Sequence, residues 1–167
     1  MNDVFRIYSS TDVAGVEYGG ALKNAIALAA GICDGFGLGD NTKAALMSRG
    51  IVEMTRLGVA LGAKAETFSG LSGMGDLIVT CTSMHSRNRR AGILIGQGVP
   101  AEQAIAQVGT VEGYHTAAAA YQLAKKASVE MPIVEQMHKV LFQQGSVPEA
   151  VKALMGRPKK LEHEPRL

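Results

Sequence analysis

A single lysine stands in a stretch of small and apolar residues near the start of the chain. In GGALKNAIALAAG, residues 19–31, Lys23 is the only ionisable side chain. On a helix its neighbours three and four positions away would be Gly19, Gly20, Ile26 and Ala27. Burial makes an ammonium group lose its proton more easily, so a lysine here could act as an acid or base. The alternative is a structural lysine that extends its charged end to water from the rim of a helix pair.

A glycine-rich loop supplies a possible partner for this lysine. The loop FSGLSGMGD, residues 68–76, ends in Asp76, which could be an ordinary acidic residue at a helix start or the carboxylate that pairs with Lys23. A dinucleotide-binding loop needs GxGxxG after a strand and before a helix. Here the glycine spacing is reversed and no strand precedes it, so we expect no dinucleotide site in this loop.

The motif SRNRR, residues 86–90, has residue types that bind anions. Ser86, Arg87 and Asn88 would stand at a helix N-terminus, where free backbone N–H groups favour anions and a guanidinium fits a phosphate. The alternative is a solvated basic face. Nucleic acid is a poor partner, because no aromatic residues interleave with the arginines and the net charge is only +2.

Other features exclude further classes of protein. We expect no metal site, because none of the four histidines has metal-ligand spacing: His85, His115, His138 and His163. No signal peptide is visible, and no stretch reaches the roughly 18 uncharged apolar residues of a membrane span. Cys33 and Cys81 fit free thiols in a reducing compartment, so we expect a cytoplasmic protein.

The composition and the capping residues predict an all-α domain. With 167 residues, of which 47% are hydrophobic and 20 are glycine, the chain can form one well-packed domain of closely spaced helices. Cap residues, glycines and prolines predict about eight helices. They cover about 13–30 with Gly31 as the stop, 41 or 42 to 61, a helical turn in 77–83, 86–95, a helix from Pro100, 112–126, a helix from Pro132 to Gly145, and one after the capping box SVPE at 146–149.

The run VFRIY, residues 4–8, is the only good strand signal. A lone strand cannot form a sheet, so we interpret it as the last strand of a sheet whose other strands are missing. The predicted organisation is a strand remnant and linker at 1–12, a helical domain at 13–156 and a charged tail at 157–167.

Together these motifs resemble one family. In this order, GVEYGGALKNAIALAAG, SGMGDLIVTCTS, SRNRR and VEG resemble NAD(P)-dependent glycerol-3-phosphate dehydrogenase of the bacterial type, over about residues 4–156. The resemblance implies the all-helical C-terminal domain of that family, a 6-phosphogluconate dehydrogenase C-terminal-like fold. It also implies an N-terminal Rossmann domain as partner, and a substrate-binding role for this chain. Because the dinucleotide-binding unit is missing, we expect the chain alone to be inactive.

The resemblance further implies a role for each motif residue. The complete enzyme would interconvert dihydroxyacetone phosphate and sn-glycerol 3-phosphate with NAD(P)H, for glycerophospholipid synthesis, and Lys23 would transfer the proton. Arg87 and Glu112 of VEG would contact NAD(P). The implied substrate-binding residues are Lys23, Asn24, Asp76, Thr80, Ser86, Arg87 and Asn88.

A second function is open at this point: a non-catalytic helical module for homodimerisation, since helices rich in small residues also pack closely between subunits. The two hypotheses differ in where Lys23, Asp76 and Arg87 should lie. The enzyme hypothesis predicts that they meet at one cleft, and scattering over the surface would favour the hypothesis of a dimerisation module of a related two-domain dehydrogenase, although the two hypotheses are not exclusive.

Overall fold

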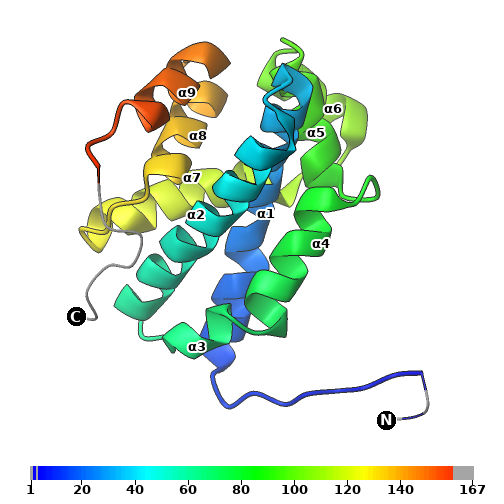
Figure 1. Cartoon of the computed structure of the whole chain (residues 1–167), viewed down its shortest axis with the longest axis vertical. Coiled ribbons are helices and arrows are strands. Elements are labelled where there is room, and N and C mark those ends of the chain that lie inside the picture. The colour runs from blue at the N-terminus through cyan, green and yellow to red at the C-terminus, as the bar shows by residue number, and fades with distance from the viewer. Residues whose placement is uncertain (1, 3, 160–167) are drawn as a thin grey trace.

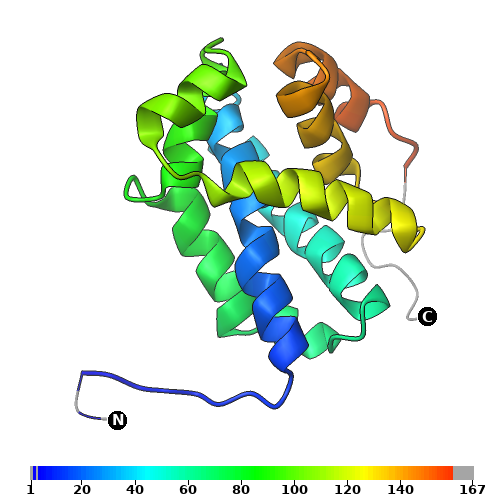
Figure 2. The same cartoon turned by 180° about the vertical axis from the view of Figure 1, so that it is seen from behind.

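The computed structural model describes residue 2 and residues 4–159, which form a bundle of helices with one long helix at its centre (Figures 1 and 2). A single π-helical turn, Leu71–Gly75, precedes α4. Residues 160–167, most of the predicted tail with His163, lie outside the described part. The α-helices are α1 (Val13–Phe36), α2 (Gly39–Ala60), α3 (Ala65–Phe68), α4 (Asp76–Thr82), α5 (Arg87–Gly96), α6 (Ala101–Val108), α7 (Glu112–Lys126), α8 (Pro132–Phe142) and α9 (Val147–Met155).

Helix α1 is the central element, and α2, α4, α5 and α7 pack around it. Asp12 begins the helix by accepting a hydrogen bond of 3.0 Å from the backbone N–H of Gly15. Gly37 ends it in the left-handed conformation, with φ of +80°. From residue 22 to residue 33 every residue of α1 is buried except Lys23, which is partly buried.

The prediction that Gly31 ends the first helix is wrong, because α1 continues through Gly31 to Phe36. Gly31 instead marks a point where the backbones of α1 and α5 touch, and a Cβ atom on it would lie 2.1 Å from the carbonyl oxygen of Arg89. Glycine is required here by a neighbouring helix, which the local sequence does not show. Four glycines lie on this contact: Gly31, Gly35, Gly92 and Gly96.

Several local predictions are confirmed. Residues 77–83 are helical apart from Ser83, since α4 covers Asp76–Thr82. Ser86 is the N-cap of α5, and Pro132 opens α8. The capping box of α9 is complete, with Ser146 and Glu149 bonded in both directions. Helix α2 begins at Gly39, slightly before the predicted start. None of the described helices has the length and apolar character needed to cross a membrane.

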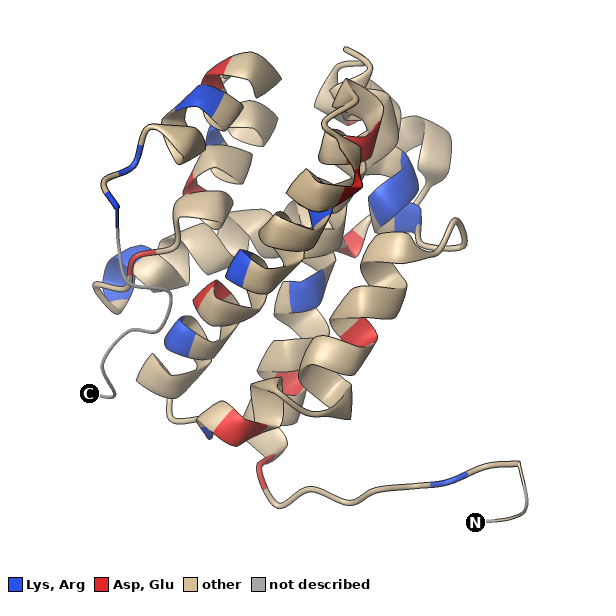
Figure 3. Cartoon of the chain, in the orientation of Figure 1, with Lys and Arg blue, Asp and Glu red and all other residues tan. Residues whose placement is uncertain are grey.

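The predicted strand at residues 4–8 has no strand to pair with in the described part of the chain. Phe5 forms an isolated bridge with Asn2, and residues 6–10 are irregular. The strand signal comes from β-branched and aromatic side chains, but a strand is stabilised by hydrogen bonds to a neighbour. Figures 1 and 3 show this segment running away from the helices.

A buried carboxylate fixes the start of α8 against α2. Glu53 is only 4% exposed. It accepts hydrogen bonds from the backbone N–H groups of Ile133, at 2.8 Å, and Val134, at 3.3 Å. These are donors that the first turn of a helix leaves without partners. Burial raises the pKa of Glu53 to about 7, although the backbone hydrogen bonds act in the opposite direction.

We expect Gly31→Ala to destabilise the chain by more than about 2 kcal/mol, because the added methyl group overlaps the α5 backbone, which cannot move without separating the helices. Gly20→Ala in the same helix is the matched control. Its Cβ would have no heavy atom within 4 Å, so the helix propensity of alanine should leave stability unchanged or raise it by up to about 1 kcal/mol. Urea unfolding measures both, and equal effects would contradict the close contact.

The pKa of Glu53 predicts a pH dependence of stability. Because this pKa is about 7 in the folded chain and 4.5 in its ordinary state, the folded chain binds the proton more tightly. The contribution of Glu53 to the free energy of unfolding is therefore full below the pKa that Glu53 has in the unfolded chain. It is lost as the pH rises through the pKa that Glu53 has in the folded chain. From about pH 5 to about pH 8, the free energy of unfolding of the wild type should therefore fall relative to that of Glu53→Gln. A difference between the two proteins that stays constant with pH in urea unfolding would contradict this.

Candidate functional site

Lys23 and Asp76 form an ion pair, in which Lys23 Nζ donates to Asp76 Oδ2. Lys23 extends from the middle of α1, and Asp76 is the first residue of α4. The lysine side chain is 16% exposed and the aspartate side chain 39% exposed. The hypothesis that Asp76 is the carboxylate partner of Lys23 is therefore correct as geometry, and the ammonium is not left unpaired.

The loop before Asp76 lies directly against α1 and α3, and a glycine at each contact permits the close approach. A Cβ atom on Gly19 would lie 2.8 Å from the carbonyl oxygen of Ser72, and one on Gly73 would lie 2.1 Å from that of Phe68. Gly19 is one helical turn before Lys23 and shares its face of α1. The π-helical turn that follows α3 thus brings Asp76 to Lys23, and π-turns are frequent at functional sites.

Thr80 connects this ion pair to a neighbouring pocket. Its hydroxyl oxygen lies 2.6 Å from the backbone oxygen of Asp76 and 3.3 Å from Asp76 Oδ1. Thr80 also lines the pocket, and so does Asn24, which follows Lys23 in the sequence. Lys23 and Asp76 are not among the lining residues of the pocket, but Asp76 contacts Thr80 and Lys23 precedes Asn24 in the chain.

Asn24, Asn88 and Glu112 are joined by hydrogen bonds whose direction is fixed by the backbone. The N–H of Gly113 donates to Asn88 Oδ1 at 2.8 Å. Asn88 Nδ2 must then be the donor to Asn24 Oδ1, at 2.9 Å, and Asn24 Nδ2 the donor to Glu112 Oε2, at 3.0 Å. Both asparagines are buried, so this chain of bonds ties α1, α5 and the start of α7 together.

Arg87 is exposed at the first position of α5. Its side chain has no ion-pair or hydrogen-bond partner within residue 2 and residues 4–159. Ser86 precedes it as the N-cap, and its hydroxyl oxygen accepts from the backbone N–H of Arg89 at 3.2 Å. The start of α5 therefore offers an unpaired guanidinium beside a helix N-terminus, which is an arrangement that favours anions.

One pocket of about 300 Å³ lies at this place. Six of the eight residues implied by the resemblance line it, including Arg87 and Glu112, whereas Lys23 and Asp76 do not. Sequence reasoning missed Val79, Ser83, His85 and Thr110, because only the folded loops bring them here. The pocket lining is Asn24, Val79, Thr80, Ser83, His85, Ser86, Arg87, Asn88, Thr110 and Glu112.

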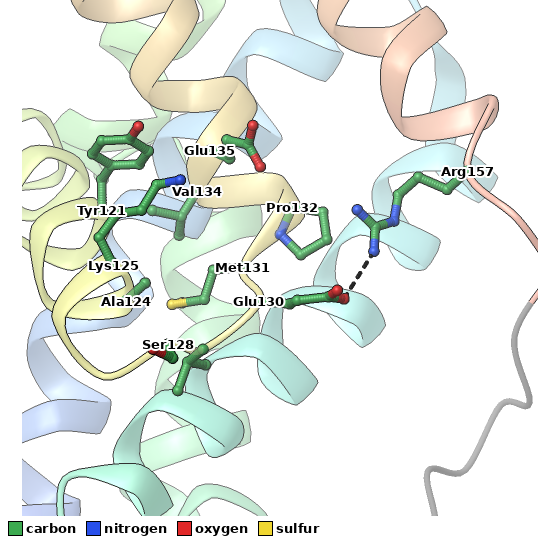
Figure 4. A pocket seen from close by; sticks show the side chains of 11 residues that line it. Tyr121, Ala124, Lys125, Ser128, Glu130, Met131, Pro132, Val134, Glu135 and Arg157 are labelled. Atoms are coloured by element: carbon green, nitrogen blue, oxygen red, sulfur yellow. Dashed lines mark hydrogen bonds and ion pairs between the residues drawn. The ribbon is translucent and has the colours of Figure 1, made fainter.

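A second pocket, of about 360 Å³, lies between α7 and α8 and contains none of the predicted residues (Figure 4). Arg157 and Glu130 form an ion pair of 3.2 Å at its edge. Figure 4 also places the carboxylate of Glu135 on its wall. Arg157 is thus paired with a carboxylate, and the ammonium of Lys125 lies over the ring of Tyr121, 5.5 Å from its centroid.

The chain is similar to known proteins over nearly its whole length. The family model described as the C-terminus of NAD-dependent glycerol-3-phosphate dehydrogenase matches residues 12–152. Glycerol-3-phosphate dehydrogenases (NAD(P)+) of Clostridium perfringens and Fusobacterium nucleatum are each 61% identical over 163 residues, which cover 97% of this chain and 49% of the relative. A glycerol-3-phosphate dehydrogenase structure from Coxiella burnetii is 42% identical with a TM-score of 0.89, and covers 94% of this chain and 49% of that one. The chain thus spans about half the length of the curated relatives it matches.

Proposed function

Since the chain belongs to the family of C-terminal domains of NAD-dependent glycerol-3-phosphate dehydrogenase, we propose that it is the substrate-binding half of an enzyme that interconverts dihydroxyacetone phosphate and sn-glycerol 3-phosphate. The observation that carries this proposal is that the unpaired Arg87 lines a pocket to which the Lys23–Asp76 pair is connected, because Asp76 contacts the lining residue Thr80 and Lys23 precedes the lining residue Asn24. A module used only for dimerisation gives no reason for that convergence. The relatives are named as dehydrogenases, which also supports an enzymatic function over a dimerisation module.

Lys23 is proposed as the group that transfers the proton. A bound NAD(P)H would supply hydride to C2 of dihydroxyacetone phosphate. The carbonyl oxygen then needs a proton, which the Lys23 ammonium donates and, in the reverse reaction, takes back. Asp76 holds the ammonium in place through the ion pair, and Thr80 holds Asp76. Asn24 lines the pocket beside Lys23 and is oriented by its bonds to Asn88 and Glu112.

Arg87 and Ser86 are proposed to hold the phosphate end of the substrate. A phosphate carries nearly two negative charges, and Arg87 is the arginine of SRNRR that lines the pocket. The guanidinium can bind two phosphate oxygens at once. Of the pocket residues, only Arg87 and Glu112 are proposed to contact NAD(P). The sequence contains no GxGxxG between a strand and a helix, so the main cofactor site is assigned to the other half of the enzyme.

That other half is proposed to be a Rossmann domain that packs near Lys23. Four apolar side chains on α1, the π-helical turn and α4 are between 37% and 55% exposed: Val16, Met74, Ile78 and Val79. Apolar surface of this kind is typical of an interface. We further propose that residues 1–12 link the two domains, that 13–156 form the substrate domain, and that 157–167 are a tail. The buried free thiols of Cys33 and Cys81 support a reducing, cytoplasmic setting.

The test joins this chain to the N-terminal half of the Clostridium perfringens relative, in place of that protein's own C-terminal half. The joined protein should oxidise NADH in the presence of dihydroxyacetone phosphate, which is followed by absorbance. A joined protein that is folded and binds NADH, yet leaves dihydroxyacetone phosphate unchanged, would contradict the proposed function.

In the joined protein, Lys23→Met should lower kcat by roughly 100-fold or more, because the reaction loses its proton donor. Stability should change by no more than about 1 kcal/mol, since the remaining Asp76 carboxylate is partly exposed to water. Lys139→Met, which removes an exposed helix-surface pair with Glu135, is the control and should leave kcat unchanged. A kcat close to that of the wild type in Lys23→Met would contradict the proton-transfer role and would indicate that Lys23 is purely structural.

Arg87→Lys should raise the KM for dihydroxyacetone phosphate about 10- to 100-fold, although the charge is kept. Lysine cannot reproduce a bidentate contact, and a charge-assisted contact of this type contributes about 1.5–3 kcal/mol. Arg90→Lys is the matched control, because Arg90 is exposed and does not line the pocket. Steady-state kinetics measure the KM of both variants. Equal small increases in KM would contradict a specific phosphate contact and would indicate a diffuse basic face.

A further inference from the structure

We propose that Arg89 is a positioning residue, whose guanidinium fixes both ends of the loop between α4 and α5 and thereby places Ser86 and Arg87 at the pocket. The loop comprises residues 83–86, and three of its four residues line the pocket: Ser83, His85 and Ser86. The expected effect on substrate binding rests on the proposed function, in which this pocket binds the phosphorylated substrate, whereas the effect on the loop does not.

The guanidinium of Arg89 is held by Asp34, a partly buried carboxylate near the end of α1. Nε of Arg89 donates to Asp34 Oδ2 at 2.8 Å, and a terminal nitrogen lies 2.7 Å from the same oxygen. The other oxygen of Asp34 accepts from Lys43 Nζ, in α2, at 2.9 Å. All three side chains are less than a fifth exposed. Arg89 is therefore anchored to α1 and, through Asp34, to α2.

Asp34 remains ionised in this setting. Burial opposes its ionisation, but the hydrogen bonds from Lys43 and Arg89 outweigh burial and hold the pKa of its carboxyl below the usual value. The anchor is thus a charged cluster with both carboxylate oxygens occupied. Breaking one of its bonds would leave a partly buried charge without its partner, so the cluster resists displacement.

From this anchor, Arg89 reaches across to the end of α4. Its Nη1 lies 2.8 Å from the carbonyl oxygen of Thr82, the last residue of α4, and 2.8 Å from Met84 Sδ. Its backbone N–H donates to the hydroxyl of Ser86, at the other end of the loop. One residue therefore contacts the end of α4, the middle of the loop and the N-cap of α5.

The helix geometry explains why Arg89 and Arg87 differ. Successive residues of an α-helix are about 100° apart, so two residues two positions apart point to nearly opposite sides. Arg89 points to Asp34 in the bundle, whereas Arg87 is left to line the pocket. A lysine at position 89 could reach Asp34 but has no planar fork to bond Thr82 at the same time.

The first experiment uses this chain alone and compares Arg89→Lys with Arg90→Lys by amide hydrogen exchange. Without the second arm of the guanidinium, the amides of residues 83–87 should exchange at least about tenfold faster in Arg89→Lys, while those of α7 and α8 stay protected. Arg90→Lys should match the wild type. Unchanged exchange of the loop in Arg89→Lys overturns the proposal.

The second experiment uses the joined two-domain protein and separates positioning from stability. Misplacing Ser86 and Arg87 weakens substrate binding, so Arg89→Lys should raise the KM for dihydroxyacetone phosphate about tenfold and change kcat by no more than about twofold. A merely structural role would lower the melting temperature and the active fraction without moving KM, and that result overturns the proposal.

Two further measurements keep the outcome decisive. If Arg89→Lys does not fold, Asp34→Asn weakens the same anchor while keeping the guanidinium, and the same exchange and KM results are expected of it. If the wild-type joined protein is inactive, the proposed function fails, but faster loop exchange in the chain alone would still support the positioning role of Arg89.

Discussion

The site depends on the direct contact between the backbones of α1 and α5. Because glycines face the neighbouring main chain on both sides, the two helices lie closer than side chains would allow, and they run in parallel. This register sets Asn24 on α1 beside Asn88 on α5, and these two residues follow Lys23 and Arg87 in the chain. Three contacts advance by four residues on both helices: Asn24–Asn88, Leu28–Gly92 and Ile32–Gly96.

The sequence predicts most of this fold where the determinants are local. Ser86 and Ser146 are read as caps because a cap bonds within its own first turn. Gly31 is misread as a stop because a glycine required by another helix looks the same as one required by a turn. The strand signal at residues 4–8 comes from side-chain types alone, and no strand pairs with this segment among the described residues. Errors arise wherever the deciding contact is distant in the sequence.

The candidate site follows the same pattern. The lone lysine, the acidic loop end and SRNRR can be found in the sequence, because each places an unusual polar group among small residues. The sequence cannot separate Arg87 from Arg89, since that depends on where Asp34 lies when α1 and α5 are packed. Nor does it show that Gly113, through one backbone N–H, determines which way both asparagines of the site point.

The direction of that hydrogen-bond chain gives the pocket an electrical polarity. Because Gly113 can only donate, Asn24 must donate to Glu112, and Glu112 is held as an acceptor at the pocket wall. The carboxylate of Glu112 disfavours a phosphate, whereas the guanidinium of Arg87 attracts it, and both line the same pocket. Under the proposed function, the phosphate therefore binds near Arg87 and Ser86. The same proposal leaves the side of Asn24, which follows Lys23 in the chain, for the carbon that reacts, and it gives one backbone amide in α7 a part in orienting the substrate.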